Sequence, residues 1–222
     1  MKNTQKITDA IISQGILPLY FNSDPEVCLN LMQALYDAGI RAIEFTNRGD
    51  AAFENFRKMV ALRNEKMPEL LLGIGTIKNL DDAKKYLDAG ANFLVSPGFV
   101  ADVAAHCVAS DIFYAPGCMT PSEIIATENA GIKFIKLFPG DMLGPAYLST
   151  IKPVFPKLLF MPTGGVEPTA ENIGAWFKAG VSAVGMGSKL VSKTLMAEKA
   201  YATIAKNAAA VLDTIQQVRN NP

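Results

Sequence analysis

The chain of 222 residues has few of the residues that build disulfide frameworks or zinc sites. It contains three scattered cysteines, Cys28, Cys107 and Cys118, without a Cys-x-x-Cys pair, and a single histidine, His106. Sparse and unpaired cysteines indicate reduced thiols and a cytoplasmic protein. A lone histidine argues against a zinc enzyme, because zinc is usually held by several histidine or cysteine ligands. A magnesium site made of carboxylates stays open, and resistance to EDTA would decide it.

Long apolar runs and an excess of charge of one sign are also missing. No stretch of about 18 apolar residues occurs, and the first residues lack the continuous apolar core of a secretion signal, so we expect no membrane segment. Lysine plus arginine equals aspartate plus glutamate at 21 each. This balance disfavours nucleic acid and anionic membranes as partners, although a local cluster of donors could bind a small anion.

One short motif recurs along the chain. It consists of a polar residue, Ala-Gly and an apolar residue, and its glycines are Gly39, Gly90, Gly131 and Gly180. Glycine directly after a helical segment is the usual signal for a helix C-terminus. The short apolar stretch that follows each glycine is typical of a buried parallel strand. Successive glycines are 51, 41 and 49 residues apart, so each interval has room for two strand–helix units.

Eight strands that alternate with helices follow from this pattern. The expected strands are residues 16–21, 41–45, 70–75, 92–96, 112–115, 133–138, 158–162 and 182–186. The expected helices are residues 25–38, 51–65, 79–89, 101–109, 121–130, 144–152, 169–179 and 189–215, after a short opening helix over about residues 3–14. We therefore predict an α/β fold, a (β/α)₈ TIM barrel with a short N-terminal helix, as a single domain over residues 1–222. An open doubly wound sheet is the alternative, because alternation does not show closure.

The second expected strand carries a carboxylate on an unusual face. Side chains alternate across a strand, so Glu44, Thr46 and Arg48 share one face, and Ile43 and Phe45 share the other. If the apolar pair packs under helices, Glu44 points into the barrel, whose active sites lie at the carboxyl ends of the strands. A structural salt bridge of Glu44 with Arg48 or a lysine is the alternative interpretation.

The sixth expected strand places a lysine in an apolar run, in the sequence GIKFIKLFPGD. With Ile135 and Leu137 packed outward, Lys136 points into the barrel as Glu44 does, while Lys133 lies at the strand entry and reaches solvent. Burial disfavours the charged form of an amine, and a neutral amine adds to ketones. A nearby carboxylate can then move protons. The alternative is a buried ion pair without catalytic role.

Glycine pairs end the last two expected strands. The sequence PTGG ends at Gly165, and GMGS ends at Ser188, which we expect to open the last helix. Consecutive glycines expose backbone N–H groups that can hold a phosphate, and a helix N-terminus attracts anions. The exits of strands seven and eight are the recurrent phosphate site of this fold. With Lys136 and Glu44, this set suits Schiff-base chemistry on a phosphorylated keto sugar acid.

Taken together, these motifs resemble one known family over roughly residues 5–210. The family is the class I 2-keto-3-deoxy-6-phosphogluconate (KDPG) and 2-keto-4-hydroxyglutarate (KHG) aldolases. The motifs that carry the resemblance are IEFTNR (43–48), GIGT (73–76), SPG (96–98), PGCMTPSE (116–123), IKLFPG (135–140), PTGG (162–165) and GMGS (185–188). The resemblance implies a homotrimeric barrel, without metal or organic cofactor, that acts in the Entner–Doudoroff pathway. The implied reaction cleaves KDPG to pyruvate and glyceraldehyde 3-phosphate, and also 4-hydroxy-2-oxoglutarate to pyruvate and glyoxylate.

The resemblance also implies roles for individual residues. Lys136 falls on the Schiff-base lysine, and Glu44 falls on the general acid/base. The implied substrate-binding residues are Arg48 and Thr76 for the pyruvate carboxylate, Pro97 and Phe138 as walls around the Schiff base, and Thr163 beside the sugar hydroxyls. The implied phosphate binders are Gly164, Gly165, Gly187 and Ser188.

Three departures from the family pattern leave the sugar acid open. Asn47 stands where leucine is more familiar, Lys189 follows Ser188 where some members have tryptophan, and GDMLGP (140–145) replaces an Ala-Glu segment. A galactonate-derived epimer is therefore an alternative substrate. Two alternatives from other classes are a non-catalytic phosphosugar-binding barrel, which needs no inward lysine facing a carboxylate, and an isomerase-type barrel, which forms no imine.

Overall fold

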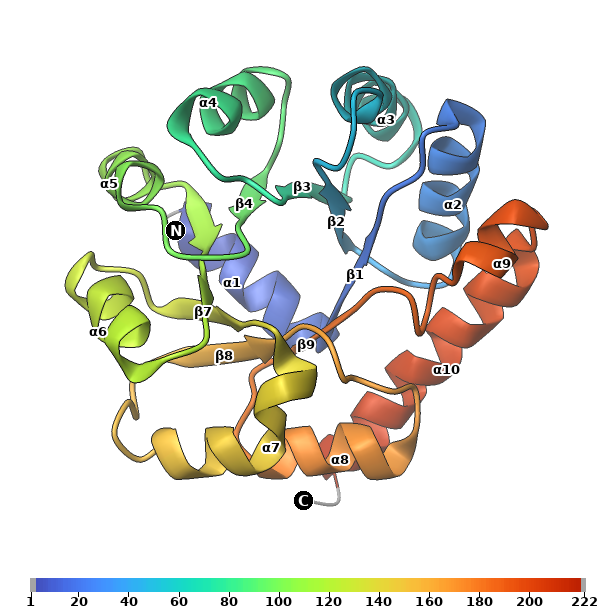
Figure 1. The fold of residues 1–222 in the computed structure, drawn as a ribbon. Helices are drawn as coiled ribbons and strands as arrows, with labels where there is room; N and C mark the ends of the chain where they lie inside the picture. Colours follow the sequence, from blue (N-terminus) through green and yellow to red (C-terminus); the bar gives the residue numbers. More distant parts are fainter. Residues whose placement is uncertain (1–2, 221–222) are drawn as a thin grey trace.

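A ring of parallel strands surrounded by helices makes up this computed structural model, which describes residues 3–220 (Figure 1). The strands are β1 (Ile16–Tyr20), β2 (Ala42–Thr46), β3 (Leu71–Gly75), β4 (Phe93–Val95), β5 (Phe113–Ala115), β6 (Gly117–Cys118), β7 (Phe134–Leu137), β8 (Leu159–Pro162) and β9 (Val184–Met186). The helices are α1 (Asn3–Gln14), α2 (Pro25–Asp37), α3 (Ala52–Lys66), α4 (Leu80–Asp88), α5 (Ala101–Ala109), α6 (Pro121–Asn129), α7 (Gly140–Ile151), α8 (Ala170–Lys178), α9 (Lys193–Ala197) and α10 (Tyr201–Asn220).

The ring consists of two sheets that join at both ends. One sheet has the order β5-β4-β3-β2-β1-β9 and the other the order β6-β7-β8, and every pair is parallel. A bridge between Thr163 and Gly185 links β8 to β9. On the other side, Pro116 divides one strand into β5 and β6, because proline has no N–H to donate to a sheet. The (β/α)₈ prediction is confirmed, and the open sheet is wrong.

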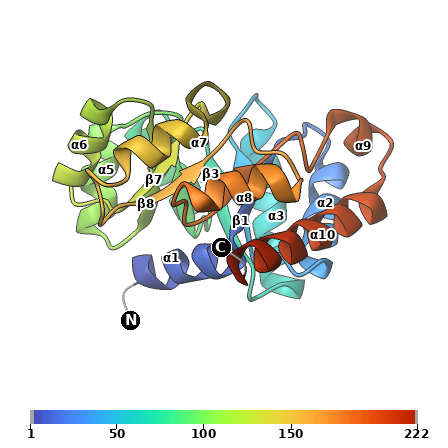
Figure 2. The ribbon, with the colours of Figure 1, turned by 90° about the horizontal axis from the view of Figure 1, so that it is seen from below.

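Two apolar layers hold the barrel together. The larger layer lies between strands and outer helices and includes Ile43, Phe45, Ile135 and Leu137. The smaller layer fills the lower part of the barrel interior, with side chains such as Phe93, Phe113 and Phe134. Helix α1 lies beneath the strands and closes this layer with its buried Ile7 and Ile11, as the sequence predicted for an opening helix (Figure 2). The closed floor leaves the other end of the barrel for a site.

The recurring Ala-Gly motif ends four helices in the same way. Gly39, Gly90, Gly131 and Gly180 have φ of 97°, 102°, 86° and 99°. In each case the residue after the glycine donates a backbone hydrogen bond to the carbonyl five residues earlier, as Ile40 does to Leu35 at 3.0 Å. This is a Schellman motif, which needs the left-handed conformation that glycine adopts at little cost. The motif therefore sets the point where each helix turns into the next strand.

The end of the chain differs from the expectation. The predicted single helix over residues 189–215 is wrong, because a turn at Gly187–Val191 is followed by the short helix α9 and then by α10. Ser192 caps α9 by accepting a hydrogen bond from Leu195 N at 3.1 Å, which fixes the helix start beyond the predicted one. Ser188 consequently lies in the turn and does not open a helix.

Helix α7 starts four residues before the predicted 144–152. Gly144 inside it has non-helical angles, φ 71° and ψ 168°, and Pro145 follows. The predicted start therefore marks a kink, and the first turn, Gly140–Leu143, is placed beside the strand ends. None of the helices in residues 3–220 has the length and apolarity needed to cross a bilayer.

Two glycine substitutions separate backbone conformation from packing. Gly131→Ala should lower the free energy of unfolding by about 1 kcal/mol, because an L residue is strained at φ 86° although the nearest atom to its Cβ, Val108 Cγ1, is 3.8 Å away. Gly174→Ala, inside α8 with Val218 Cγ2 at 3.9 Å, should instead raise it by about 0.5–1 kcal/mol. Urea unfolding measures both, and equal signs would contradict this account of the motif.

Candidate active site

A lysine and a glutamate meet inside the upper part of the barrel. Lys136 on β7 and Glu44 on β2 have side chains that are 6% and 1% exposed, and Lys136 Nζ lies 3.8 Å from Glu44 Oε1. Their strand neighbours Ile43 and Ile135 belong to the outer apolar layer. The alternation that the sequence predicted for both strands is therefore what turns the two charged groups inward.

Missing side chains on β3 make room for the carboxylate. A Cβ atom on Gly75 would overlap Glu44 Oε1, and a Cβ on Gly73 would overlap the ring of Phe93. Gly73 and Gly75 pair with Glu44 and Thr46 in the register of β2 and β3. Gly75 of the GIGT motif thus leaves the space that Glu44 occupies, Gly73 leaves the space of the Phe93 ring below it, and any larger residue at position 75 would displace the carboxylate.

Burial governs the protonation of Glu44. Loss of water raises the pKa of this carboxyl above its ordinary value, while the Lys136 ammonium and the Arg48 guanidinium lower it in part. An ion pair at about 4 Å gains about 4 kcal/mol at an effective dielectric constant of 20. Removing an ion from water costs several kcal/mol, which is of similar size. Because the net effect is a raised pKa, desolvation exceeds the attraction at Glu44. Neither Glu44 oxygen has a hydrogen-bond partner within residues 3–220, and both are free to bind an arriving group.

The rim beyond β2 and β3 carries Arg48 and Thr76. Arg48 is exposed, and its guanidinium makes no hydrogen bond to any residue of the described chain. Thr76 has φ 63°, which is rare for a β-branched residue and costs of order 1–3 kcal/mol. Asn47, directly before Arg48, accepts a hydrogen bond from the Tyr86 hydroxyl at 2.8 Å. The polar departure at position 47 therefore does not alter the site.

Phe138, at the end of the lysine's own strand, and the 96–98 segment, which packs on β6 next to it, lie around this part of the barrel. Lys136 Nζ lies 5.3 Å from the centroid of the Phe138 ring. The Ser96 hydroxyl donates to the carbonyl of Gly98 at 2.5 Å, which holds the turn that contains Pro97. A Cβ on Gly117 would overlap the Pro97 carbonyl, so β6 lies directly against this turn.

Thr163 lies at the end of β8 and is 6% exposed. Its hydroxyl has no hydrogen-bond partner in the described chain, and Gly185 leaves the space that this oxygen takes. The next residues, Gly164 and Gly165, have φ of 94° and 67°, which no other residue type adopts readily. Their close packing on Asp141, at the start of α7, also excludes a side chain at position 165.

The loops after β8 and β9 present free backbone donors. The N–H groups of Gly165, Gly187 and Ser188 make no backbone hydrogen bond within residues 3–220, whereas the N–H of Gly164 takes part in the bridge between Thr163 and Gly185. Thr163 and Gly185 hold the two loops side by side through their bridge. Adjacent unpaired N–H groups can form a concave anion site, and Gly165, Gly187 and Ser188 present such groups although Ser188 lies in a turn.

Two acidic residues near this site had no role in the sequence interpretation. The place of a Cβ on Gly164 lies 3.0 Å from Asp141 Oδ1, and Glu167 follows the glycine pair in the chain. Asp141 could have been found from its position directly after the IKLFPG motif. Glu167 has no signal in the sequence, because its relevance comes from an ion pair with Lys189 at 2.7 Å.

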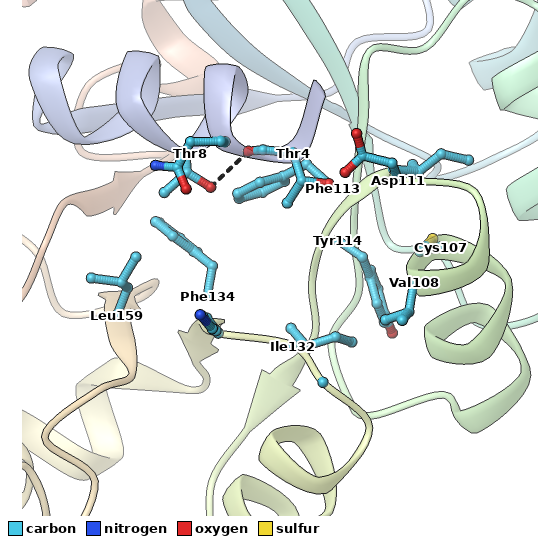
Figure 3. A pocket seen from close by; sticks show the side chains of 14 residues that line it. Thr4, Thr8, Cys107, Val108, Asp111, Phe113, Tyr114, Ile132, Phe134 and Leu159 are labelled. Atoms are coloured by element: carbon cyan, nitrogen blue, oxygen red, sulfur yellow. Dashed lines mark hydrogen bonds between the residues drawn. The ribbon is translucent and has the colours of Figure 1, made fainter. Parts of the chain in front are cut away.

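The barrel also has a cavity of about 300 Å³ at its opposite, amino-terminal end. Figure 3 shows its wall, where Thr4 and Thr8 of α1 face Phe113 and Phe134, and Thr8 donates a hydrogen bond to the Thr4 carbonyl at 2.8 Å. Lys133 lines this cavity and is exposed, as the sequence predicted. None of the predicted site residues lines it, so the cavity is separate from the Lys136–Glu44 site.

Other reactive groups do not gather at the site. Burial raises the pKa of the Cys118 thiol to about 11, so this thiol stays protonated at neutral pH. His106 is half-buried on α5, away from the strand ends. Within residues 3–220, no three histidine, cysteine, aspartate or glutamate residues lie close enough together to hold a metal ion.

Known proteins with this sequence pattern are aldolases. The model of the family described as "KDPG and KHG aldolase" matches residues 7–207. The 2-dehydro-3-deoxy-phosphogluconate aldolase of Treponema pallidum is 34% identical over 162 residues, which cover 72% of this chain and 75% of the relative.

Solved structures agree over most of the chain. The KDPG aldolase of Legionella pneumophila, with pyruvate captured as a covalent carbinolamine, has a TM-score of 0.83 and 28% identity over 92% of this chain and 97% of that one. The 2-keto-3-deoxy-6-phosphogluconate aldolase of Zymomonas mobilis with 3-phosphoglycerate has a TM-score of 0.80 and 26% identity, covering 94% and 95%.

Replacing the buried carboxylate should change how stability depends on pH. Because folding raises the pKa of Glu44, its stabilising contribution is complete below the unfolded pKa and is lost as the pH rises through the folded pKa. Glu44→Gln should therefore gain stability relative to the unmodified chain as the pH rises from about 4 to 8, by about 1.4 kcal/mol for each unit of pKa shift. Urea unfolding at several pH values measures the difference. The exposed Glu65→Gln is the matched control, and the same pH profile for both variants would refute the assignment.

Proposed function

The chain belongs to the KDPG and KHG aldolase family, and we propose that it is a class I aldolase that cleaves KDPG into pyruvate and glyceraldehyde 3-phosphate. The observation that carries the proposal is the buried Lys136 amine 3.8 Å from the Glu44 carboxylate. A barrel that only bound phosphosugars would have no use for this pair, which costs stability. An isomerase would use the carboxylate without the amine.

The reaction begins with the amine. Lys136 adds to the C2 ketone of the substrate, and the resulting carbinolamine loses water to give an iminium ion. Glu44 supplies and removes the protons of these steps, and its raised pKa suits a group that must hold a proton part of the time. The separation of 3.8 Å exceeds a direct charged hydrogen bond of about 2.8 Å, so a water or a substrate hydroxyl that contacts both groups from the side can relay the proton.

Carbon–carbon cleavage follows from the iminium ion. Glu44 takes the proton of the C4 hydroxyl, the C3–C4 bond breaks, and its electron pair moves into the iminium to give the enamine of pyruvate. The aldehyde, glyceraldehyde 3-phosphate, leaves. Protonation of the enamine at C3 and addition of water to the imine then release pyruvate and restore Lys136.

The remaining predicted residues bind and orient the substrate. Arg48 and Thr76 hold the pyruvate carboxylate at the rim, which fixes the ketone over the amine. Phe138 and Pro97 form walls beside the Schiff base. The free hydroxyl of Thr163 binds a sugar hydroxyl. The phosphate lies on the free N–H groups of Gly165, Gly187 and Ser188, beside Gly164.

Further parts of this proposal rest on the family resemblance. They are one domain over residues 1–222, a homotrimer, a cytoplasmic location, a role in the Entner–Doudoroff pathway, and catalysis without metal or organic cofactor. Light scattering of the purified chain measures the oligomer, and activity after dialysis against EDTA tests the absence of a metal.

Reductive trapping tests the chemistry directly. Pyruvate with borohydride should add the mass of a reduced pyruvyl group to Lys136 and abolish turnover, because reduction makes the imine permanent. Lys136→Met should show neither labelling nor turnover. Lys133→Met, on the same strand but exposed, is the matched control and should keep both. Peptide mapping by mass spectrometry locates the label, and a label on Lys133 or none at all would overturn the proposal.

Parallel assays of three candidate substrates identify the preferred sugar acid. We expect the highest kcat/KM for KDPG, a lower value for 4-hydroxy-2-oxoglutarate, which lacks a phosphate for the N–H site, and a lower value for the galactonate-derived epimer at C4. Pyruvate release, coupled to its reduction with NADH, measures all three. A higher kcat/KM for the epimer would reassign the sugar acid while leaving the imine chemistry in place.

A further inference from the structure

An ion pair connects the two loops that present the free N–H groups. Lys189 Nζ lies 2.7 Å from Glu167 Oε1, and the side chains are 54% and 42% exposed. Glu167 belongs to residues 163–169, after β8, and Lys189 to residues 187–192, after β9. The ammonium therefore lies between the loops that carry Gly165 and Ser188.

The charged side chains around these N–H groups disfavour a phosphate dianion unless a cation turns towards it. Asp141 contributes a carboxylate beside Gly164, and Glu167 contributes a second. Lys189 is the only cationic residue in residues 163–169 and 187–192. In the structure its charge is directed to Glu167. A phosphate on the N–H groups would lie among two carboxylates, and a cation that turned to it would reduce the repulsion.

Energetics allow Lys189 to change partners. An exposed ion pair contributes about 0–1 kcal/mol, so breaking the pair with Glu167 costs little. A charge-assisted bond to a phosphate is about twice as strong as a neutral hydrogen bond. Glu167 is the less mobile partner, because its N–H donates to Asn172 Oδ1 at 2.9 Å and Asn172 Nδ2 donates to the Gly165 carbonyl at 3.3 Å.

We propose that Lys189 determines specificity for a phosphorylated substrate by leaving Glu167 and binding the distal phosphate, with Glu167 as its competitor. The inference rests on the proposed aldolase function and deepens it. The two residues have opposite effects: Lys189 strengthens binding of a substrate that ends in a phosphate, and Glu167 weakens it. Neither affects 4-hydroxy-2-oxoglutarate in this way, because its second carboxylate is attached directly to C4 and does not extend to these loops.

The test is the ratio of kcat/KM for KDPG to kcat/KM for 4-hydroxy-2-oxoglutarate. Lys189→Met should lower this ratio by at least about tenfold, mainly through KM for KDPG, because a charged hydrogen bond is lost. Glu167→Gln should raise the ratio by about two- to fivefold, because it releases the lysine. Lys189→Arg should restore most of the ratio. Lys193→Met, at the exposed first position of α9, is the matched control and should leave the ratio unchanged.

A binding measurement keeps this inference separate from the proposed function. Calorimetry with glycerol 3-phosphate, which has the phosphate but no ketone, should show weaker binding to Lys189→Met and tighter binding to Glu167→Gln, and more so at low ionic strength. Equal changes in kcat/KM for both substrates, or unchanged glycerol 3-phosphate binding in Lys189→Met, would overturn the inference. Failure of pyruvate trapping at Lys136 would instead overturn the aldolase proposal.

Discussion

The proposed chemistry depends on a lysine and a carboxylate that are buried close together inside the barrel. Lys136 lies 3.8 Å from Glu44, and at the carboxyl desolvation, which raises the pKa, outweighs the Coulomb attraction, which lowers it. Such a pair adds little to stability and has to be supported by the rest of the fold. The apolar layer under it, closed by α1, and the larger layer under the outer helices supply that support.

The surroundings of the pair give each group a different role. Gly75 leaves room for the carboxylate, and both of its oxygens stay free of partners in the described chain, so Glu44 is positioned by packing more than by hydrogen bonds. On the opposite side the ring of Phe138 lies over the amine. A carboxylate without hydrogen-bond partners can exchange protons with a substrate without first breaking a hydrogen bond. This arrangement suits a residue that must give and take protons in one cycle.

The two ends of the site treat negative charge differently. At one rim, Arg48 has an exposed guanidinium without a hydrogen-bond partner in the described chain, which we propose binds the carboxylate. At the other, free N–H groups lie between Asp141 and the Glu167–Lys189 pair. The first end therefore has one cationic side chain, Arg48. The second end has backbone N–H donors, the carboxylates of Asp141 and Glu167, and the ammonium of Lys189. We therefore expect that differences in affinity between related sugar acids arise mainly at the second end.

Local rules in the sequence predicted most of the elements and failed at identifiable places. The Ala-Gly motif located four helix ends correctly, because a Schellman motif involves only neighbouring residues. The helix expected over residues 189–215 was wrong, since the turn at Gly187–Val191 and the cap at Ser192 interrupt a segment whose composition suits a helix. The kink at Gly144 was mistaken for the start of α7 for a similar reason.

By itself, the sequence determined which face of each strand carries Glu44 and Lys136, because alternation along a strand is a property of neighbouring residues. It also determined where glycines replace side chains. Only the tertiary structure decided that β2 and β7, far apart in the chain and not paired with each other, bring these two groups to 3.8 Å. It alone paired Glu167 with Lys189 and placed Asp141 beside Gly164. Those distances arise from the closure of the barrel, which no local pattern contains.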